Sequence, residues 1–300
     1  MTAEERSRGC LLGLAAGDAV GTAVEFKDRG SFPPVTGMTG GGPFDLEPGQ
    51  WTDDTSMALC LATSLVECGG FDARDQMDRY LDWYRSGYMS CTGTCFDIGN
   101  TVAGSLRRYA DTGDPLSGPA DPMTAGNGSI MRLAPVPIYF FPDIAETIRR
   151  SEESSRTTHG APQCLSACRL FGEVLHRALS GMSKNEILFL PFSGEFRNDR
   201  LASIALGEYR DKPAGVIRGT GYVVDSLEAA LWCFFNTASF EGAILAAANL
   251  GDDADTTAAV CGQVAGAHYG MRGIPQGWLE KLTMRGEIIS LADRLMNNEI

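Results

Sequence analysis

The sequence predicts an all-α fold, and three observations support this prediction. Seven segments place apolar residues near the 3.6-residue period of a helix. These segments are 55–68, 73–87, 100–111, 164–181, 226–237, 240–250 and 288–297. Two further stretches repeat glycine every four residues, and strand candidates are few. The β-like run at 133–141 contains Pro135 and Pro137, so an irregular entry into a helix suits it as well as a strand does.

The two glycine stretches predict helices that pack closely. On a helix, glycines four residues apart form one smooth ridge that a neighbouring backbone can approach. The first ridge consists of Gly9, Gly13, Gly17 and Gly21, and the second of Gly262, Gly266 and Gly270. We expect both helices to be buried and to lie against each other in one core. In a chain with 36 glycines, a coincidental spacing is the alternative.

Length and composition predict one compact domain over residues 1–300. Hydrophobic residues make up 44% of the chain and charged residues 21%, which is near the average of globular proteins. The segments 26–50 and 191–220 look irregular, but neither has the low-complexity composition of a free linker. Similar acidic motifs lie near both ends of the chain, which favours a single domain. We also expect a monomer.

Charge and cysteine content exclude some classes of partner. With 38 acidic and 25 basic residues the net charge is −13, which repels a phosphate backbone, so we expect no nucleic-acid or anionic-membrane binding. Nine cysteines, an odd number, lie mostly in apolar stretches, which is typical of a reduced, cytoplasmic protein. Asp18 interrupts the longest apolar run near the start, so we expect neither a secretory signal nor a membrane span.

Acidic clusters occur where two predicted helices begin, in WTDDTSMALC near residue 52 and in GDDADTTAAVC near residue 253. Together they supply hard oxygen ligands of the kind that Mg²⁺ or Mn²⁺ prefers: Thr52, Asp53, Asp54, Asp253, Asp255 and Thr256. The alternative is that these residues only cap their helices, because Asp and Thr are favoured N-caps. If the fold brings both clusters together, their charge would be strongly unfavourable without a cation.

Four motifs in one order give the chain a resemblance to a known family. They are GDAVGTAVEF, TDDT, GNGS and DADT, and the match extends from about Arg8 to the C-terminus. The chain resembles the ADP-ribosylglycohydrolase family, most closely its dinitrogenase-reductase-activating branch. The resemblance implies an all-α fold with a binuclear centre of two divalent cations, Mg²⁺ or Mn²⁺, that hydrolyses the bond between ADP-ribose and a modified side chain.

The resemblance also implies roles for single residues. The TDDT and DADT motifs match the two metal-ligand motifs of the family, although Asp252 replaces the glycine that commonly precedes the second. Glu25 matches an acidic residue beside the metals, and Asp97, in FDIGN, aligns with a catalytic carboxylate. From the residues alone, the favoured interpretations are a solvated acid for Glu25 and a helix cap for Asp97.

A third set of residues is expected to bind substrate. The GNGS turn offers successive N–H groups suited to a diphosphate, although an ordinary turn is the commoner meaning of Asn-Gly. Tyr222 resembles a position over the substrate, and His159 matches a histidine of the cleft, with a supporting hydrogen-bonding role as its alternative. The full set is Gly99, Asn100, Asn127, Gly128, Ser129, His159 and Tyr222.

We therefore expect an enzyme that removes ADP-ribose from ADP-ribosylated protein side chains, with ADP-ribose as the product. Arginine is the favoured linkage, which makes the bond N-glycosidic. The alternatives are a hydrolase of O-linked ADP-ribose, on serine or in O-acetyl-ADP-ribose, a helical phosphohydrolase that releases phosphate, and an ADP-ribose-binding protein without turnover. The intact acidic clusters argue against a pure binder, which has no need to gather so many carboxylates.

Overall fold

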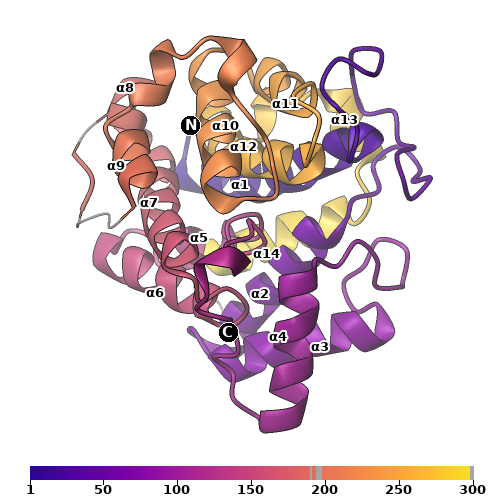
Figure 1. The fold of residues 1–300 in the computed structure, drawn as a ribbon, viewed down its shortest axis with the longest axis vertical. Coiled ribbons are helices and arrows are strands. Elements are labelled where there is room, and N and C mark those ends of the chain that lie inside the picture. The colour runs from indigo at the N-terminus through magenta and orange to yellow at the C-terminus, as the bar shows by residue number, and fades with distance from the viewer. Residues whose placement is uncertain (190, 194–197, 298–300) are drawn as a thin grey trace.

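Two glycine-rich helices from opposite ends of the chain pack along each other in the middle of the fold (Figure 1). They are α1 (Ala3–Gly21) and α12 (Ala254–Tyr269). A Cβ atom added at Gly13 would collide with the carbonyl oxygen of Gly262, and one added at Gly262 would collide with that of Gly13. The predicted contact between the two glycine ridges is therefore confirmed.

The all-α prediction is also confirmed. The computed structural model describes residues 1–189, 191–193 and 198–297, and within these ranges it contains helices and isolated β-bridges but no strand. The other α-helices are α2 (Asp53–Cys68), α3 (Ala73–Ser86), α4 (Asn100–Thr112), α5 (Pro135–Tyr139), α6 (Ile144–Arg156), α7 (Pro162–Leu179), α8 (Lys184–Phe189), α9 (Asp199–Ala205), α10 (Val223–Phe235), α11 (Phe240–Ala248), α13 (Gln276–Lys281) and α14 (Arg285–Asn297). Among the described residues, no helix is both long and apolar enough to cross a membrane.

The seven segments with helical periodicity form α2, α3, α4, α7, α10, α11 and α14. The run at 133–141 forms the short helix α5 and not a strand. Helix α6 was not predicted because its buried face is made of small polar side chains, Thr147, Ser151, Ser154 and Ser155, which leave no apolar period to detect. Ion pairs such as Glu146–Arg150 line its exposed face.

Of the two segments that were predicted to be irregular, one is a loop and the other contains short helices. Residues 26–50 form a loop without an α-helix, and Asn249 anchors it through hydrogen bonds between its side-chain amide and both backbone groups of Val35 (2.8 and 2.9 Å). The expectation for 191–220 is wrong in part, because α9 and two short 3₁₀ helices lie within it. Residues 194–197 of this segment lie outside the described residues.

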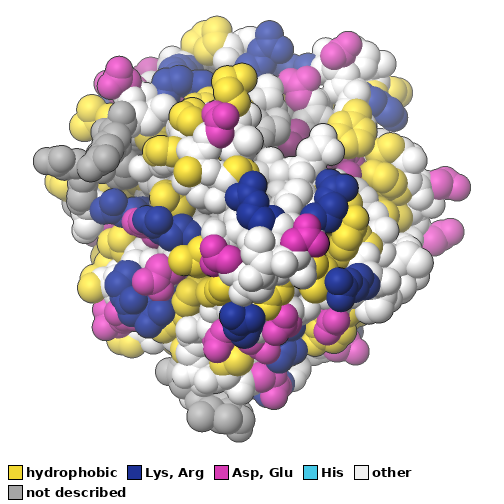
Figure 2. All heavy atoms as spheres, turned by 60° about the horizontal axis from the view of Figure 1, so that its bottom comes forward, with side chains coloured by type: hydrophobic (Ala, Val, Ile, Leu, Met, Phe, Trp, Pro, Cys, Tyr) yellow, Lys and Arg dark blue, Asp and Glu magenta, His cyan; other side chains and the backbone are white. Residues whose placement is uncertain are grey.

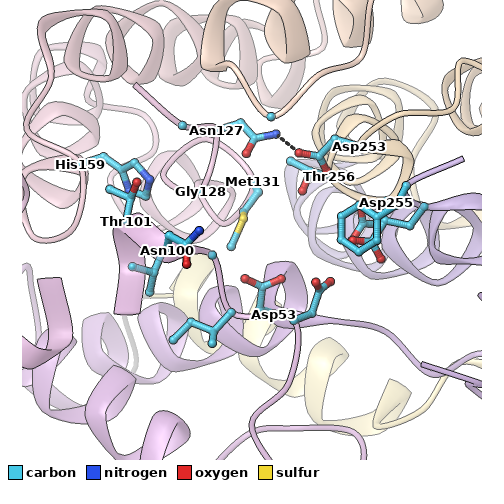
Figure 3. Close-up of a pocket in the computed structure, with 18 residues that line it drawn as sticks. Asp53, Asn100, Thr101, Asn127, Gly128, Met131, His159, Asp253, Asp255 and Thr256 are labelled. Carbon is cyan, nitrogen blue, oxygen red and sulfur yellow. Dashed lines mark hydrogen bonds between the residues drawn. The ribbon is translucent and has the colours of Figure 1, made fainter. Parts of the chain in front are cut away.

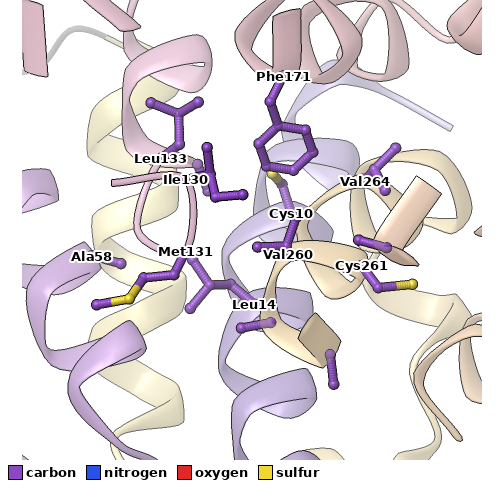
Figure 4. Close-up of a cluster of buried hydrophobic side chains, with 14 of the residues drawn as sticks. Cys10, Leu14, Ala58, Ile130, Met131, Leu133, Phe171, Val260, Cys261 and Val264 are labelled. Carbon is purple, nitrogen blue, oxygen red and sulfur yellow. The ribbon is translucent and has the colours of Figure 1, made fainter. Parts of the chain in front are cut away.

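The apolar core surrounds the α1–α12 pair. Side chains of α1, α2, α7 and α12 meet there with those of the segment that precedes α5 (Figure 4). The labelled members are Cys10, Leu14, Ala58, Ile130, Met131, Leu133, Phe171, Val260, Cys261 and Val264. All nine cysteines are free thiols, and burial raises the pKa of those within the core, such as Cys10. Inert, buried thiols of this kind act as small hydrophobic residues.

The close helix contact predicts the effect of a single methyl group. Gly13→Ala should lower the free energy of unfolding by about 1–3 kcal/mol, because neither backbone can move away without disturbing a packed core. Gly104 in α4 is the matched control, since an added Cβ there meets no atom within 4 Å. Gly104→Ala should raise the unfolding free energy by about 0.5–1 kcal/mol. Chemical denaturation measures both, and equal effects at the two positions would contradict the packing argument.

Candidate metal centre and substrate cleft

Carboxylates from three helices meet where α2 and α12 begin. Asp18, Asp54 and Asp255 each offer an oxygen within 4.8 Å of the others, and so do Glu25, Asp97 and Asp255. Asp255 thus belongs to both groups. The two acidic motifs, about 200 residues apart in the chain, are adjacent in the fold because α1 and α12 are packed together.

Asp18 is a residue of this site that the sequence analysis did not identify. Its carboxylate accepts hydrogen bonds from the backbone N–H groups of Thr52 (2.9 Å) and Thr55 (3.1 Å) and from both of their hydroxyl groups. These are N–H groups of the first turn of α2, which have no partner within that helix. Asp18 therefore caps α2 from a different helix and sets the direction of the TDDT motif. The GDAVG sequence around it was the available signal.

The acidic residues do not cap their own helices. Neither α2, with Thr52 as N-cap, nor α12, with Asp253 as N-cap, has a hydrogen bond from its first turn to the side chain of that residue. The hydroxyl of Thr52 instead faces Asp18 (3.0 Å), Asp54 (3.1 Å) and Asp255 (3.3 Å). One hydroxyl proton cannot satisfy three carboxylates. The interpretation as ordinary helix caps is therefore wrong.

The donor set fits divalent cations. One oxygen each of Asp54, Asp255 and Glu25 is buried without a hydrogen-bond partner. Burial, with the charge of neighbouring carboxylates, raises the pKa of Asp53, Asp54 and Asp255 well above the usual range. Buried carboxylates without partners are costly unless a cation compensates their charge. Oxygen ligands in this number suit a hard divalent ion.

Glu25 and Asp97 lie side by side at the edge of this cluster. In the metal-free site, burial and then the charge of Asp97 raise the pKa of Glu25 to about 10. Burial and then the charge of Asp18 raise the pKa of Asp97 to about 7. Glu25 is only 4% exposed, so it is not a solvated acid. Asp97 does not cap α4, whose N-cap is Gly99, and it has a left-handed backbone with φ of 58°.

A cavity of about 480 Å³ opens above the carboxylates. Figure 3 shows Asp53, Asp253 and Asp255 on one side of it and Asn100 and His159 on the other. The predicted site residues that line it are Glu25, Asp53, Asp97, Gly99, Asn100, Asn127, Gly128, His159, Asp253, Asp255 and Thr256. Gly126 of the predicted GNGS turn also lines it, and the lining residues that were not predicted are Phe26, Ile98, Thr101, Val102, Met131 and Gly221. Its volume is that of a typical small-molecule site.

The remaining predicted residues lie around the cavity. Thr52 and Asp54 are buried behind the lining carboxylates. Tyr222 lines a neighbouring cavity of about 560 Å³, which shares Thr101, Gly126 and Gly221 with the first. Ser129 is buried, and its hydroxyl oxygen is 3.4 Å from the thiol of Cys168 in the core.

The first two residues of the GNGS turn, Gly126 and Asn127, are hydrogen-bonded to other backbone groups. The N–H of Gly126 donates to Thr124 and that of Asn127 to Gly221, so neither of these N–H groups faces a ligand as the sequence predicts. The Asn127 amide donates to Asp253 (2.9 Å), as the dashed line in Figure 3 indicates. The turn therefore links the cleft and the acidic cluster, and the expectation of successive N–H groups that face a ligand is wrong for its first two residues.

His159 and Arg132 lie behind this turn. Burial, and then the positive charge of Arg132, lowers the pKa of His159 to about 3, so the imidazole is neutral at physiological pH. Arg132 is fully buried and donates to the carbonyl of Gly128 (2.6 Å) and the hydroxyl of Thr158 (2.6 Å). Among the described residues, no carboxylate forms an ion pair within 4.0 Å of this guanidinium. A buried positive charge thus lies behind the GNGS end of the cleft, and the carboxylates lie at the other end.

The outer surface has no comparable separation of charge on the face in Figure 2. Lysine and arginine side chains are intermingled there with aspartate and glutamate, over the part of the chain that the structure describes. Ion pairs between such side chains, for example Arg149–Glu153 and Arg156–Glu152, occur in the described part of the chain. That face presents no broad basic area of the kind that attracts a nucleic acid.

The fold and this cleft define a class of helical hydrolase, and comparison with known proteins identifies it. The family model described as ADP-ribosylglycohydrolase matches residues 1–300, so the chain belongs to this family. A protein named ADP-ribosylarginine hydrolase Tri1, from Serratia proteamaculans (strain 568), is 44% identical over 97% of this chain and 79% of its own length. The ADP-ribosyl-[dinitrogen reductase] glycohydrolase of Rhodospirillum rubrum is 34% identical over 94% of this chain and 92% of its own. A solved structure titled "ADP-ribosylglycohydrolase-related protein complex" matches with a TM-score of 0.86 at 44% identity and covers 99% of both chains.

The pKa shifts predict that the metal-free protein loses stability as pH rises. In an unfolded chain these carboxyls titrate near pH 4, whereas in the metal-free fold the pKa of Asp97 is about 7 and that of Glu25 about 10. Between these values the folded state binds more protons than the unfolded state, so the unfolding free energy falls with pH. The lowered pKa of His159 acts in the opposite direction only below about pH 6.5.

The melting temperature of chelator-treated protein should therefore fall from pH 6.5 to 9. Mn²⁺ should raise it more at pH 9 than at pH 6.5, because a cation bound only by the folded state stabilises that state by mass action and removes the repulsion. Calorimetric scans across this range measure both effects. A melting temperature that does not change with pH, together with no effect of Mn²⁺, would contradict the charge argument.

Variants of two nearby aspartates distinguish the loss of a metal ligand from the loss of one negative charge. Asp255→Asn should weaken Mn²⁺ binding by more than about tenfold and should raise the melting temperature of the metal-free protein, because one buried charge is lost. Asp252→Asn is the matched control: Asp252 lies outside both carboxylate groups, and Asn tolerates its left-handed backbone. Isothermal titration with Mn²⁺ measures the two affinities. Equal losses in both variants would mean that Asp255 contributes only its charge.

Proposed function

We propose that this protein is a metal-dependent hydrolase that cleaves the N-glycosidic bond between ADP-ribose and arginine side chains of modified proteins. The observation that supports it most is the meeting of two acidic helix starts, with buried unpartnered carboxylate oxygens, at one end of a cleft that has the buried Arg132 behind its other end. Such a cleft suits a ligand with ribose hydroxyls at one end and a diphosphate at the other. The names of the arginine-specific relatives favour that linkage.

Thr52, Asp53, Asp54, Asp253, Asp255 and Thr256 would hold two divalent cations, Mg²⁺ or Mn²⁺. When bound, the cations supply positive charge that offsets the carboxylates, orients ribose hydroxyls and lowers the pKa of water. Asp18 would not be a ligand, because both of its oxygens already accept hydrogen bonds from Thr52 and Thr55. Its role in this proposal is to position the TDDT ligands.

Hydrolysis adds water across the glycosidic bond. The water oxygen bonds to the anomeric carbon, the carbon–nitrogen bond breaks, and the departing guanidine nitrogen takes up a proton. The site therefore needs a group that accepts a proton, negative charge near the anomeric carbon and a group that returns a proton. Asp97 and Glu25 lie side by side at the edge of the acidic cluster, so their carboxyl groups would accept and return the proton.

The opposite end of the cleft would hold the rest of ADP-ribose. The N–H groups of Gly128 and Ser129 would approach the diphosphate, and the charge of Arg132 behind them would favour an anion there. Gly99, Asn100, Asn127 and neutral His159 would line the ribose and phosphate region. The neighbouring cavity, lined by Tyr222, would receive the remaining nucleoside.

One experiment tests the reaction and its linkage. Purified protein is incubated with arginine-linked, serine-linked and acetyl-linked ADP-ribose, each with Mg²⁺, Mn²⁺ or chelator, and the products are identified by mass spectrometry. We expect ADP-ribose from the arginine-linked substrate only when metal is present. Release of phosphate, preference for an O-linked substrate, or binding of ADP-ribose without turnover would overturn the proposal.

Asp97→Asn separates catalysis from structure. If Asp97 exchanges the proton, the rate of arginine-linked hydrolysis should fall about 100- to 10,000-fold, while the melting temperature and ADP-ribose affinity stay near those of the unchanged protein. Asp72 is the matched control, because it is a true N-cap whose side chain accepts from the first turn of α3. Asp72→Asn should change neither rate nor stability appreciably, since Asn caps as well as Asp. If the Asp97→Asn enzyme keeps its rate within a fewfold of the unchanged protein, Asp97 does not exchange the proton and that role is assigned to Glu25.

A further inference from the structure

Phe26 is a large apolar side chain left in solvent at the edge of the cleft. It is 69% exposed, although it follows Glu25 directly and lines the same cavity as Asp97. Most other large apolar side chains of the described residues are buried in the core. Packing therefore does not explain the presence of a phenyl ring at this position.

The backbone at Phe26 is strained and firmly held. Its φ of 60° lies in the left-handed region, which bulky residues rarely adopt, and Asp252 opposite has a φ of 56°. The N–H of Phe26 donates to the carbonyl of Asp252 (2.8 Å), and the N–H of Asp252 donates to the carbonyl of Lys27 (2.9 Å). This pair of hydrogen bonds joins the residue to the loop that bears the second acidic motif.

Strain of this kind persists where the surrounding structure enforces it, and it is concentrated at functional sites. Gly or Asn would adopt the same backbone at lower cost. The fold thus keeps an exposed ring, in an unfavourable conformation, at a fixed distance from the catalytic carboxyls. A role in contacting a ligand accounts for both features, whereas a role in the core accounts for neither.

The ring is also free to accept a cation. The basic side chains nearest in sequence are engaged elsewhere, since Lys27 donates to the carbonyl of Ala23 and Arg29 to that of Ala214. Cation–π pairs occur at other rings, such as Arg177 over Phe192, but within the described part of the chain none involves Phe26. The face of an aromatic ring attracts a guanidinium group.

We propose that Phe26 is a specificity-determining residue that holds the guanidinium of the modified arginine against its ring. This inference rests on the proposed arginine hydrolase function. The bond to be cleaved must lie beside Glu25 and Asp97, so the leaving side chain extends past them toward the mouth of the cleft, where the ring stands. A glycosylated guanidinium keeps its positive charge, and carboxylates next to an aromatic face favour such a group. The neutral oxygen of an O-linked substrate gains nothing from this contact.

The test compares four variants on an arginine-linked ADP-ribosyl peptide. Phe26→Ala should lower kcat/KM by about 2- to 30-fold, the range that one cation–π contact supplies. Phe26→Leu should lose as much, because it keeps the bulk without the ring face. Phe26→Trp should retain or exceed the original activity. Phe26→Asn should lose activity yet melt at a higher temperature, because Asn relieves the left-handed strain.

Two controls assign the cause. The inhibition constant of free ADP-ribose should stay within about twofold in every Phe26 variant, because the product lacks the guanidinium. Leu206, which is 71% exposed, directly follows α9 and lines neither cavity, is the matched apolar residue, and Leu206→Ala should not alter kcat/KM. Full activity in Phe26→Leu, an unaffected Phe26→Ala, or a parallel loss of ADP-ribose inhibition would overturn the inference. If the unchanged protein fails to cleave the arginine-linked peptide, the proposed function itself fails instead.

Discussion

The site depends on the direct backbone contact between α1 and α12. The glycine ridge of α1 ends at Gly21, where an added Cβ would collide with the backbone of Ala254 and Asp255. No side chain therefore separates the end of α1 from the start of α12. Asp18 on α1 lies within reach of Asp255 for this reason, and it caps α2 at the same point. One packing contact thus places the first turns of two distant helices around a common centre.

The charge of the carboxylates gathered at this centre indicates what the site can bind. Buried carboxylates that face each other would normally weaken a fold, and here their pKa values rise because of burial and mutual repulsion. Among the described residues, no basic side chain forms an ion pair with Asp53, Asp54 or Asp255, and the buried guanidinium of Arg132 donates instead to the carbonyl of Gly128. The acidic end therefore suits a divalent cation.

Much of the secondary structure could be predicted from local pattern. Where a helix buries apolar residues, as α2 and α7 do, their 3.6-residue spacing was visible in the sequence. Where it buries serine and threonine, as in α6, no hydrophobic period existed, although the helix packs just as closely: Gly172 of α7 lies against Ser151. Short helices such as α9 and α13 have too few turns to establish a period.

The sequence by itself determined the all-α class, the two glycine ridges and the ligand types in the acidic motifs, because each depends on residues close together in the chain. It could not distinguish a helix cap from a metal ligand, since both need the same side chains at the same place. Only the tertiary structure rules out the helix caps, by bringing Asp18 to cap α2 and by leaving one oxygen each of Asp54 and Asp255 without a hydrogen-bond partner. The left-handed Phe26 and the closed first half of the GNGS turn were likewise decided by contacts with Asp252 and Gly221. These contacts span about 90 to 230 residues of chain, a separation at which no local pattern holds information.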